Sequence, residues 1–180
     1  DAGDDVRTGD NIPEVAVDPV GGALYVVWQD ARFSDGEFDS IAFSQSLDGG
    51  LTWSDTIKVN LTPTDVLPGN QQAFTPSVHV AADGTVGVTY YDFRNDQRGD
   101  TSLSTDVWIT HSHDGGRTFS DESRLTATSF DMRTAPDALG YFVGDYAGLD
   151  HAGTVFHPTW VGANDGNLAN RTDVLHRRAQ

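Results

Sequence analysis

Short runs in which apolar and polar residues alternate recur along the chain, and Gly, Pro, Asn and Asp bound most of them. A period of two residues places every second side chain on one face of a β-strand, whereas an amphipathic helix repeats about every 3.6 residues. The helical period is nearly absent, so the pattern predicts an all-β fold. The predicted strands span residues 13–17, 23–28, 41–46, 55–60, 75–80, 85–91, 106–112, 123–126, 141–149, 155–161 and 173–178.

Two copies of one motif, S-x-D-G-G-x-T-[WF], follow the third and the seventh predicted strands, and their first residues lie 66 positions apart. Asp-Gly-Gly favours a hairpin turn, because glycine adopts positive φ freely and Asp accepts hydrogen bonds from its own turn. The terminal aromatic is expected to pack against the sheet. We therefore assign both motifs to folding. The first box comprises Ser46, Asp48, Gly50, Thr52 and Trp53, and the second box comprises Ser112, Asp114, Gly116, Thr118 and Phe119.

Other landmarks repeat in the same register. Trp28, Tyr90 and Trp160 occupy one position, and the triplet at 30–32 matches the triplet at 92–94. Three units of roughly 60 residues are typical of a β-propeller with one four-stranded blade per unit. The predicted blades span about residues 5–54, 55–121 and 122–180. The alternative is a tandem β-sandwich.

The two boxes resemble the Asp-box, or BNR repeat, of the sialidase-like six-bladed propellers. The surrounding W-x-D-x-R pattern is similar to bacterial secreted members of that superfamily, and residues 144–149 (GDYAGL) resemble their last blade. The resemblance implies half of a six-bladed propeller, a secreted or cell-surface protein, a glycan ligand and an exo-sialidase-like glycoside hydrolase activity. Asp-boxes are structural turns in that superfamily, so the resemblance is more specific for fold than for activity.

Three blades do not close a ring, because closed propellers contain about four to eight. The sequence therefore predicts that further blades or a second copy of the chain complete the propeller. Residues 5–8 are expected to supply an outer strand to a neighbouring or partner blade.

The net charge of the chain indicates which classes of partner it is unsuited to bind. The formal net charge is −16, with 27 acidic residues against 11 basic ones, and 24 of the acidic residues are Asp. This balance argues against binding to nucleic acid or to anionic membranes, which both require a basic surface. No apolar run approaches the roughly 20 residues of a membrane span. The chain has no cysteine, which excludes disulfides.

The strand order predicts that the long loops share one side of the molecule and the short turns the other. Long loops on a rigid scaffold commonly bind ligands. These loops span residues 30–40, 61–73, 92–105, 127–140 and 162–172. Arg32 and Arg94 follow Asp30 and Asp92 by two residues, and their guanidinium groups could bind a ligand carboxylate; Arg133 lies in the fourth loop. The alternative is that each Arg pairs with its own Asp and joins neighbouring blades.

The catalytic assignment follows from the resemblance, since sialidases use a Tyr nucleophile. It points to Tyr146 beside Asp145, although Tyr146 could instead be a packed aromatic of an inner strand. The Phe-Arg-Ile-Pro motif of the superfamily is absent, and neither its third arginine nor the Glu that activates the Tyr can be mapped. The active site is therefore expected to be incomplete on this chain. The alternative function is a non-catalytic propeller module that binds glycan or protein through its long loops.

No cofactor is required by this interpretation, but two groups of side chains could hold a metal. Asp35, Glu37 and Asp39 offer oxygen ligands suited to calcium, although a solvated acidic loop explains them equally. His111 and His113 share one side of a predicted strand and could bind zinc, but no third ligand is evident.

Overall fold

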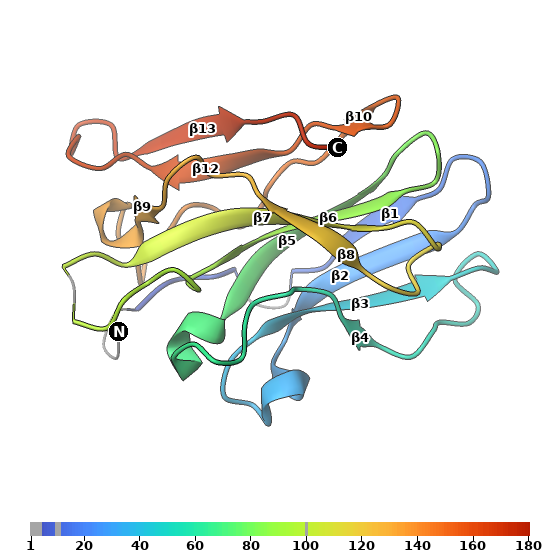
Figure 1. Cartoon of the computed structure of the whole chain (residues 1–180), viewed down its shortest axis with the longest axis horizontal. Coiled ribbons are helices and arrows are strands. Elements are labelled where there is room, and N and C mark those ends of the chain that lie inside the picture. The colour runs from blue at the N-terminus through green and yellow to red at the C-terminus, as the bar shows by residue number, and fades with distance from the viewer. Residues whose placement is uncertain (1–4, 10–11, 100) are drawn as a thin grey trace.

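The structure is a computed structural model that describes residues 5–9, 12–99 and 101–180. It confirms the all-β prediction, with antiparallel sheets joined by loops that contain only short 3₁₀ helices (Figure 1). The first sheet has the order β1 (Glu14–Val17), β2 (Leu24–Asp30), β3 (Ser40–Ser46) and β4 (Ile57–Lys58). The second sheet has the order β5 (Ala73–Val80), β6 (Val86–Asp92), β7 (Ser104–Ser112) and β8 (Ser120–Arg124), and β9 (Phe130–Asp131) also pairs with β7.

The third unit, residues 141–179, is less regular than the first two. It contains the pairs β10 (His151–Ala152) with β11 (Val155–Phe156) and β12 (Thr159–Ala163) with β13 (Thr172–His176). The strand predicted at 141–149 is wrong, because this segment forms only isolated bridges at Tyr141 and Gly148. The strand predicted at 155–161 is interrupted at His157 and Pro158, since proline has no N–H to donate to a ladder.

The long loops carry the short helices η1 (Ala31–Ser34), η2 (Pro68–Gln71) and η3 (Met132–Thr134). The predicted blade boundaries at 54/55 and 121/122 do not follow the hydrogen bonds. β4 pairs with β3 of the first sheet, and β8 pairs with β7 across the second boundary. The first hydrogen-bonded sheet therefore extends to residue 58, and the second extends past residue 122 to β9.

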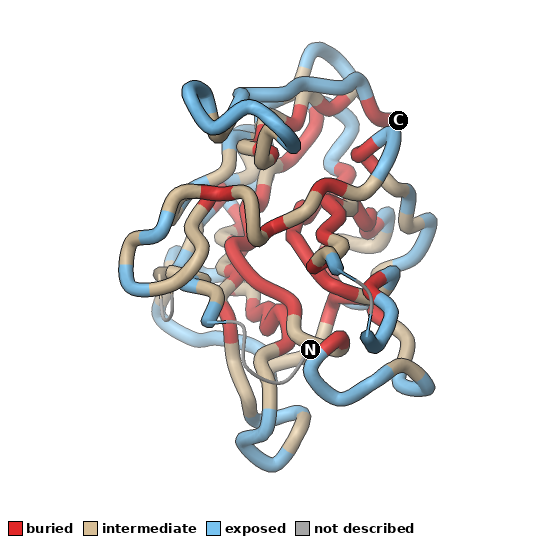
Figure 2. The backbone as a smooth tube through the Cα atoms, turned by 90° about the vertical axis from the view of Figure 1, so that its left-hand side faces the viewer, coloured by how far each residue is buried: buried red, intermediate tan, exposed pale blue. Residues whose placement is uncertain are grey.

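The second sheet is the middle layer of the molecule, and every residue of β6 is buried. One core lies between the first and second sheets and includes Val27, Phe43 and Val88. The other lies between the second sheet and the third unit and includes Tyr91 and Phe156. Figure 2 shows the buried segments in the interior and the exposed ones at the periphery. The second sheet thus has a hydrophobic core on each of its two faces.

The two boxes form the same hydrogen-bonded turn. In the first box, Ser46 Oγ donates to Asp48 Oδ1 over 2.8 Å and Thr52 Oγ1 donates to Asp48 Oδ2 over 2.6 Å. In the second box, Ser112 and Thr118 make the equivalent bonds to Asp114 over 2.8 and 2.6 Å. The structural role predicted for the boxes agrees with these bonds.

The aromatic residues that end the boxes differ in environment. Phe119 packs edge-on against Phe43 of the first sheet, with ring centroids 4.9 Å apart. Trp53 lines a shallow hollow with Val26, Trp28 and Ser44 of the first sheet but remains 46% exposed, so it packs against the sheet only in part. The reason is that no described segment covers the side of the first sheet on which Trp53 lies.

The N-terminal segment does not form the expected outer strand. Val6 pairs in parallel with Tyr141, and Arg7 N donates to the Tyr141 carbonyl over 3.0 Å. The Thr8 carbonyl accepts a bond of 3.2 Å from Thr75 Oγ1 on β5. Residues 5–8 therefore connect the third unit of the same chain to the inner strand of the second sheet.

Candidate functional site

Arg94, one of the predicted ligand-binding residues, is enclosed by its own protein. Its side chain is 9% exposed, and its Nε donates to Asp92 Oδ2 over 2.6 Å. Its two terminal nitrogens bind Glu122 over 2.5 and 3.1 Å, and its guanidinium carbon lies 3.8 Å from the centroid of the Trp108 ring. Arg94 and Asp92 are therefore not available to a ligand, and the alternative interpretation, a structural ion pair, is the better one.

The cluster around Arg94 is a closed polar network between the first two sheets. Asp92 also accepts bonds from Trp108 Nε1 over 2.9 Å and from Thr62 Oγ1 over 2.7 Å. Burial raises the pKa of Asp92, an effect that the charge of Arg94 opposes. Burial also raises the pKa of Glu122 to about 7, and the hydrogen bond from the Leu61 backbone N–H opposes this effect. A buried network of this kind holds its members in one geometry.

Arg32 occupies the equivalent position in the first sheet but remains 53% exposed. Its Nε and one terminal nitrogen lie 2.8 and 2.7 Å from Asp30 Oδ2, which also accepts a bond of 2.8 Å from Trp28 Nε1. Arg32 is thus paired with Asp30, and one face of its guanidinium is open to solvent. Arg133, the third predicted arginine, lies on η3, where its backbone N–H donates to Asp131 Oδ1 over 3.0 Å.

The predicted catalytic pair does not lie on an inner strand. Tyr146 is 65% exposed and belongs to no strand, so it is not a packed aromatic of an inner strand, and its role as a nucleophile stays a prediction. Asp145 Oδ2 pairs with Arg7 over 3.4 Å, while Asp145 Oδ1 is buried and has no hydrogen-bond partner among the described residues. Glu122, which a Tyr mechanism could have used, is bound by Arg94.

The carboxylates predicted to bind calcium do not converge. Asp35 ends η1 with a φ of 56°, and Asp39 Oδ2 accepts bonds from Gln29 Nε2 over 3.3 Å and from Gln72 Nε2 over 3.0 Å. Asp35, Glu37 and Asp39 do not form a group of ligand atoms within 4.8 Å of one another. The calcium site stays a prediction that this geometry does not support.

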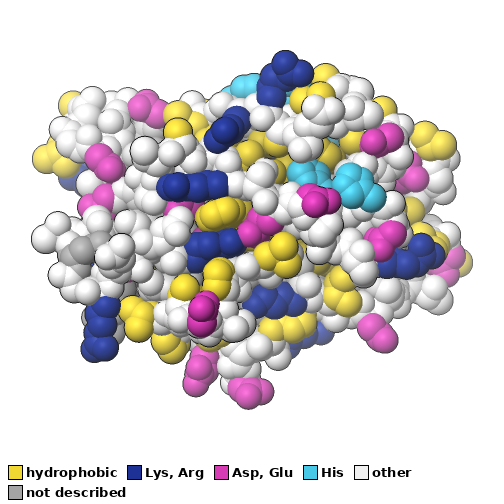
Figure 3. Space-filling view, in the orientation of Figure 1, with side chains coloured by type: hydrophobic (Ala, Val, Ile, Leu, Met, Phe, Trp, Pro, Cys, Tyr) yellow, Lys and Arg dark blue, Asp and Glu magenta, His cyan; other side chains and the backbone are white. Residues whose placement is uncertain are grey.

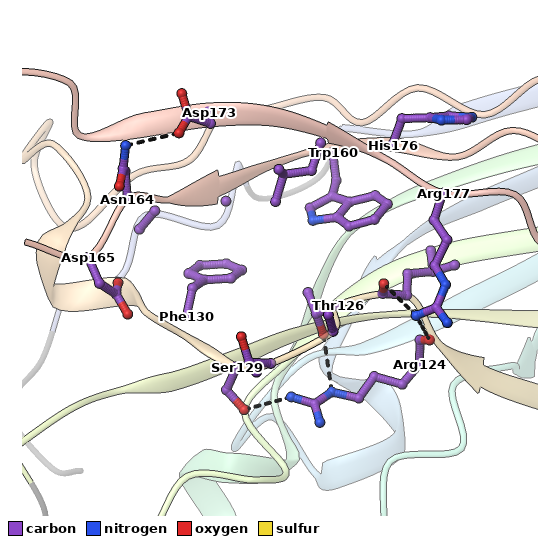
Figure 4. Close-up of a pocket in the computed structure, with 16 residues that line it drawn as sticks. Arg124, Thr126, Ser129, Phe130, Trp160, Asn164, Asp165, Asp173, His176 and Arg177 are labelled. Atoms are coloured by element: carbon purple, nitrogen blue, oxygen red, sulfur yellow. Dashed lines mark hydrogen bonds between the residues drawn. The ribbon is translucent and has the colours of Figure 1, made fainter. Parts of the chain in front are cut away.

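A cleft of about 960 Å³ opens between the second sheet and the third unit (Figure 4). The sequence predicts ligands on the long-loop side, and two of the long loops, 127–140 and 162–172, contribute to this cleft. β12 and β13 line one side in the figure, and the segment after β8 lines the other. The labelled lining residues are Arg124, Thr126, Ser129, Phe130, Trp160, Asn164, Asp165, Asp173, His176 and Arg177.

One wall of the cleft is fixed by the buried carboxylate of Asp106. Its Oδ1 accepts bonds of 2.6 Å from an Arg124 terminal nitrogen and 2.5 Å from Thr126 Oγ1. Its Oδ2 accepts bonds of 3.0 Å from Ser129 Oγ and 2.8 Å from Asn95 Nδ2. These bonds hold two hydroxyls and a guanidinium in place, a preorganised arrangement that suits a polar ligand.

The opposite wall combines aromatic and polar groups. The indole nitrogen of Trp160 is buried and has no hydrogen-bond partner among the described residues. Figure 4 shows the Trp160 and Phe130 rings on opposite sides of the same space. Asn164 Nδ2 donates to Asp173 Oδ2 over 2.9 Å. Sequence reasoning used Trp160 only as a repeat landmark and missed the cleft, because its walls meet only through packing of two units.

Comparison with solved structures identifies the fold. At a TM-score of 0.60 and 18% identity, the chain is similar to a structure titled Hadza microbial sialidase Hz136, covering 94% of this chain and 35% of the other. At the same TM-score and 16% identity it is similar to α-L-arabinanase of Penicillium chrysogenum complexed with arabinobiose, covering 97% of this chain and 48% of the other. A Dyadobacter fermentans protein of unknown function gives 0.60 at 13% identity, with 98% and 54% covered.

The fold is therefore that of the sialidase-like and glycosidase-like β-propellers. The chain spans between about a third and about half the length of these three neighbours. No protein-family model matches the sequence, and no curated protein matches it either. Among the described residues, no helix has the length and apolarity needed to span a membrane. On the face in Figure 3, basic side chains are interspersed with acidic ones and do not form a continuous basic surface.

Proposed function

We propose that this chain is a glycan-directed segment of a sialidase-like propeller and that carbohydrate binds in the cleft beside Trp160. The observation that carries the proposal is the buried indole N–H of Trp160, which has no partner in a cleft of about 960 Å³. A buried donor without a partner is destabilising, and a sugar hydroxyl oxygen could accept its hydrogen bond. The polar side chains that line the cleft could bind the hydroxyl groups of a sugar.

The geometry favours binding without catalysis. Arg94 and Glu122 form an ion pair with each other, so neither is free to act on a substrate. Tyr146 lies on the exposed surface. Hydrolysis is the second candidate, supported by the sialidase and arabinanase neighbours and by the unpartnered Asp145 Oδ1 next to Tyr146. By the same resemblance, we propose that the protein acts outside a bacterial cell and that its two boxes are Asp-boxes.

Isothermal titration with arabinobiose, sialyllactose and a panel of oligosaccharides tests glycan binding. Trp160→Phe keeps an aromatic ring but removes the N–H, so affinity should fall about three- to tenfold. Trp28→Phe is the matched control, because its indole N–H already binds Asp30 far from the cleft. Absence of binding to every sugar tested, or an equal loss in the control, would overturn the proposal.

A fluorogenic sialoside and a fluorogenic arabinoside separate the two candidates. The binding module should release no fluorophore. Turnover by the wild type that disappears in Tyr146→Phe would instead establish the hydrolase, because the substitution removes only the hydroxyl of an exposed side chain.

We further propose that the chain carries three blades and that a second copy covers the open face of the first sheet. This face presents Val15, Val17 and Trp53, which are 61%, 56% and 46% exposed. Val15 lies opposite Val26 in the β1–β2 register, so the two share this face. In the second sheet, the position of Val26 is occupied by Val88, which is fully buried against the first sheet. The open face is therefore built like one that a neighbouring blade covers.

Sedimentation equilibrium tests this assembly. The second copy predicts a mass of twice 19.4 kDa, and Val15→Asp together with Val17→Asp should return the protein to a monomer. A wild type that sediments as a monomer of 19.4 kDa at all concentrations would exclude the second copy.

A further inference from the structure

Two histidines and an aspartate converge on the short-turn side of the molecule. His79 lies on β5, His151 begins β10 about 70 residues later in the chain, and Asp150 directly precedes β10. The turn after β5 is hydrogen-bonded to the turn after β10, where Ala82 N donates to the Gly153 carbonyl over 2.9 Å. This docking of the second sheet against the third unit brings the three side chains together.

We propose that His79, Asp150 and His151 form a site for a divalent transition metal, with zinc as the preferred ion. The three ligand atoms are His79 Nε2, His151 Nδ1 and Asp150 Oδ1, and they are separated by 2.9, 3.4 and 3.9 Å. These separations bracket the roughly 3.3 Å that divides two ligands of a tetrahedral zinc ion with bonds of about 2.0 Å.

The chemistry of the three groups suits a metal. The two facing nitrogens lie 2.9 Å apart, and a metal ion bound by both would use the lone pair of each. Asp150 is 81% exposed, which lets its carboxylate adjust and leaves room for water as a fourth ligand.

Two other pairs of histidines in the chain lack the third ligand that Asp150 supplies at this site. His157 Nδ1 and His176 Nε2 lie 3.0 Å apart in stacked rings, but no carboxylate joins them within ligand distance among the described residues. His111 and His113, the predicted zinc ligands, have ring centroids 6.3 Å apart and also lack a third member. His157 and His176 therefore provide an internal control with the same two rings and no carboxylate.

A metal at this site would join the second sheet to the third unit. A ligand that binds only the folded state stabilises it by mass action. At a hundredfold excess over Kd, zinc should raise the Tm of a protein of this size by about 5 to 10 °C. Chelation should return the Tm to its starting value.

The experiment measures metal content after equilibrium dialysis against Zn²⁺, the visible absorption of bound Co²⁺, and Tm. The wild type and His176→Gln should each retain one zinc. His79→Gln and Asp150→Asn should bind zinc about ten- to a hundredfold more weakly and lose the Tm increase. Circular dichroism without metal confirms that each variant is folded, and the exposed Asp150 is the substitution least able to disturb folding.

Three results would overturn the site. Retention of one zinc with unchanged affinity in both folded variants, His79→Gln and Asp150→Asn, would show that these residues do not bind it. Loss of zinc in His176→Gln alone would move the metal to the other histidine pair. A wild type that binds no zinc at micromolar concentration would also exclude the proposal.

Discussion

The first and second sheets carry the same Asp-x-Arg triplet in two different environments. Arg94 in the second sheet is 9% exposed and binds two carboxylates, whereas Arg32 in the first sheet is 53% exposed and binds only Asp30 among the partners that the structure shows. The triplets have the same chemistry, so the difference comes from what packs on each sheet. Glu122 and Trp108 of the second sheet and Thr62 after β4 enclose Arg94. Among the described residues, Arg32 has only Asp30 and the Trp28 ring beside it. The repeated triplet therefore determines where its arginine lies in each sheet, but not how far that arginine is buried.

The largest expected effect is the removal of the buried arginine. Arg94→Ala leaves Asp92 and Glu122 buried without their cation, so the free energy of unfolding should fall by about 3 to 5 kcal/mol. Arg32→Ala should cost about 1 kcal/mol or less, because its ion pair is exposed to solvent. Urea denaturation of both variants measures the difference. Equal losses would show that burial does not separate the two triplets.

The glycines of the two boxes should show a smaller contrast. Gly50 and Gly116 both have positive φ, so alanine strains either backbone by roughly 1 to 2 kcal/mol. A Cβ at Gly116 would also lie 2.5 Å from the Phe43 ring, whereas a Cβ at Gly50 would lie 3.5 Å from Leu24. Gly116→Ala should therefore lose about 1 to 3 kcal/mol more than Gly50→Ala in the same denaturation experiment.

The sequence was sufficient to predict the long strands of the first two sheets, because period-two alternation and Gly-rich turns are local signals. It gave only approximate bounds for β4 and β8 and missed β9, which lies in a predicted loop. It was insufficient for residues 141–149, whose apolar residues pack against the core without forming a ladder. The environments of Arg32 and Arg94, the cleft beside Trp160 and the meeting of His79 with His151 all depend on contacts between units. Such contacts leave no signal in the spacing of residues along the chain.

The tryptophans that bind the two Asp carboxylates extend the comparison. Trp108→Phe removes a donor from the fully buried Asp92, and its loss should cost about 1 to 3 kcal/mol. Trp28→Phe removes the equivalent donor from Asp30. Water can replace this donor at the open face of the first sheet, so the loss of unfolding free energy should stay near or below about 1 kcal/mol. Guanidinium denaturation would contradict the comparison if Trp28→Phe proved the more damaging change.

The smallest contrast is expected where packing has no part, in the carboxylates of the two boxes. Hydrogen bonds from Thr52 and Ser46 lower the pKa of Asp48 from 3.8 to about 2, and the same kind of bonds from Thr118 and Ser112 lower the pKa of Asp114. A pKa that is lower in the folded state contributes stability above the unfolded value and loses it as the pH falls. The wild type should therefore lose stability between about pH 4 and pH 2.

Asp48→Asn and Asp114→Asn should each remove part of this acid dependence, measured as unfolding midpoints in urea at pH 2, 4 and 6. The two changes should be similar in size, because the hydrogen bonds inside the boxes have the same partners and nearly the same lengths. A much larger effect in the second box would mean that the cover provided by the first sheet also controls the titration of Asp114. The contrast between the sheets would then extend from packing to the chemistry of the turns themselves.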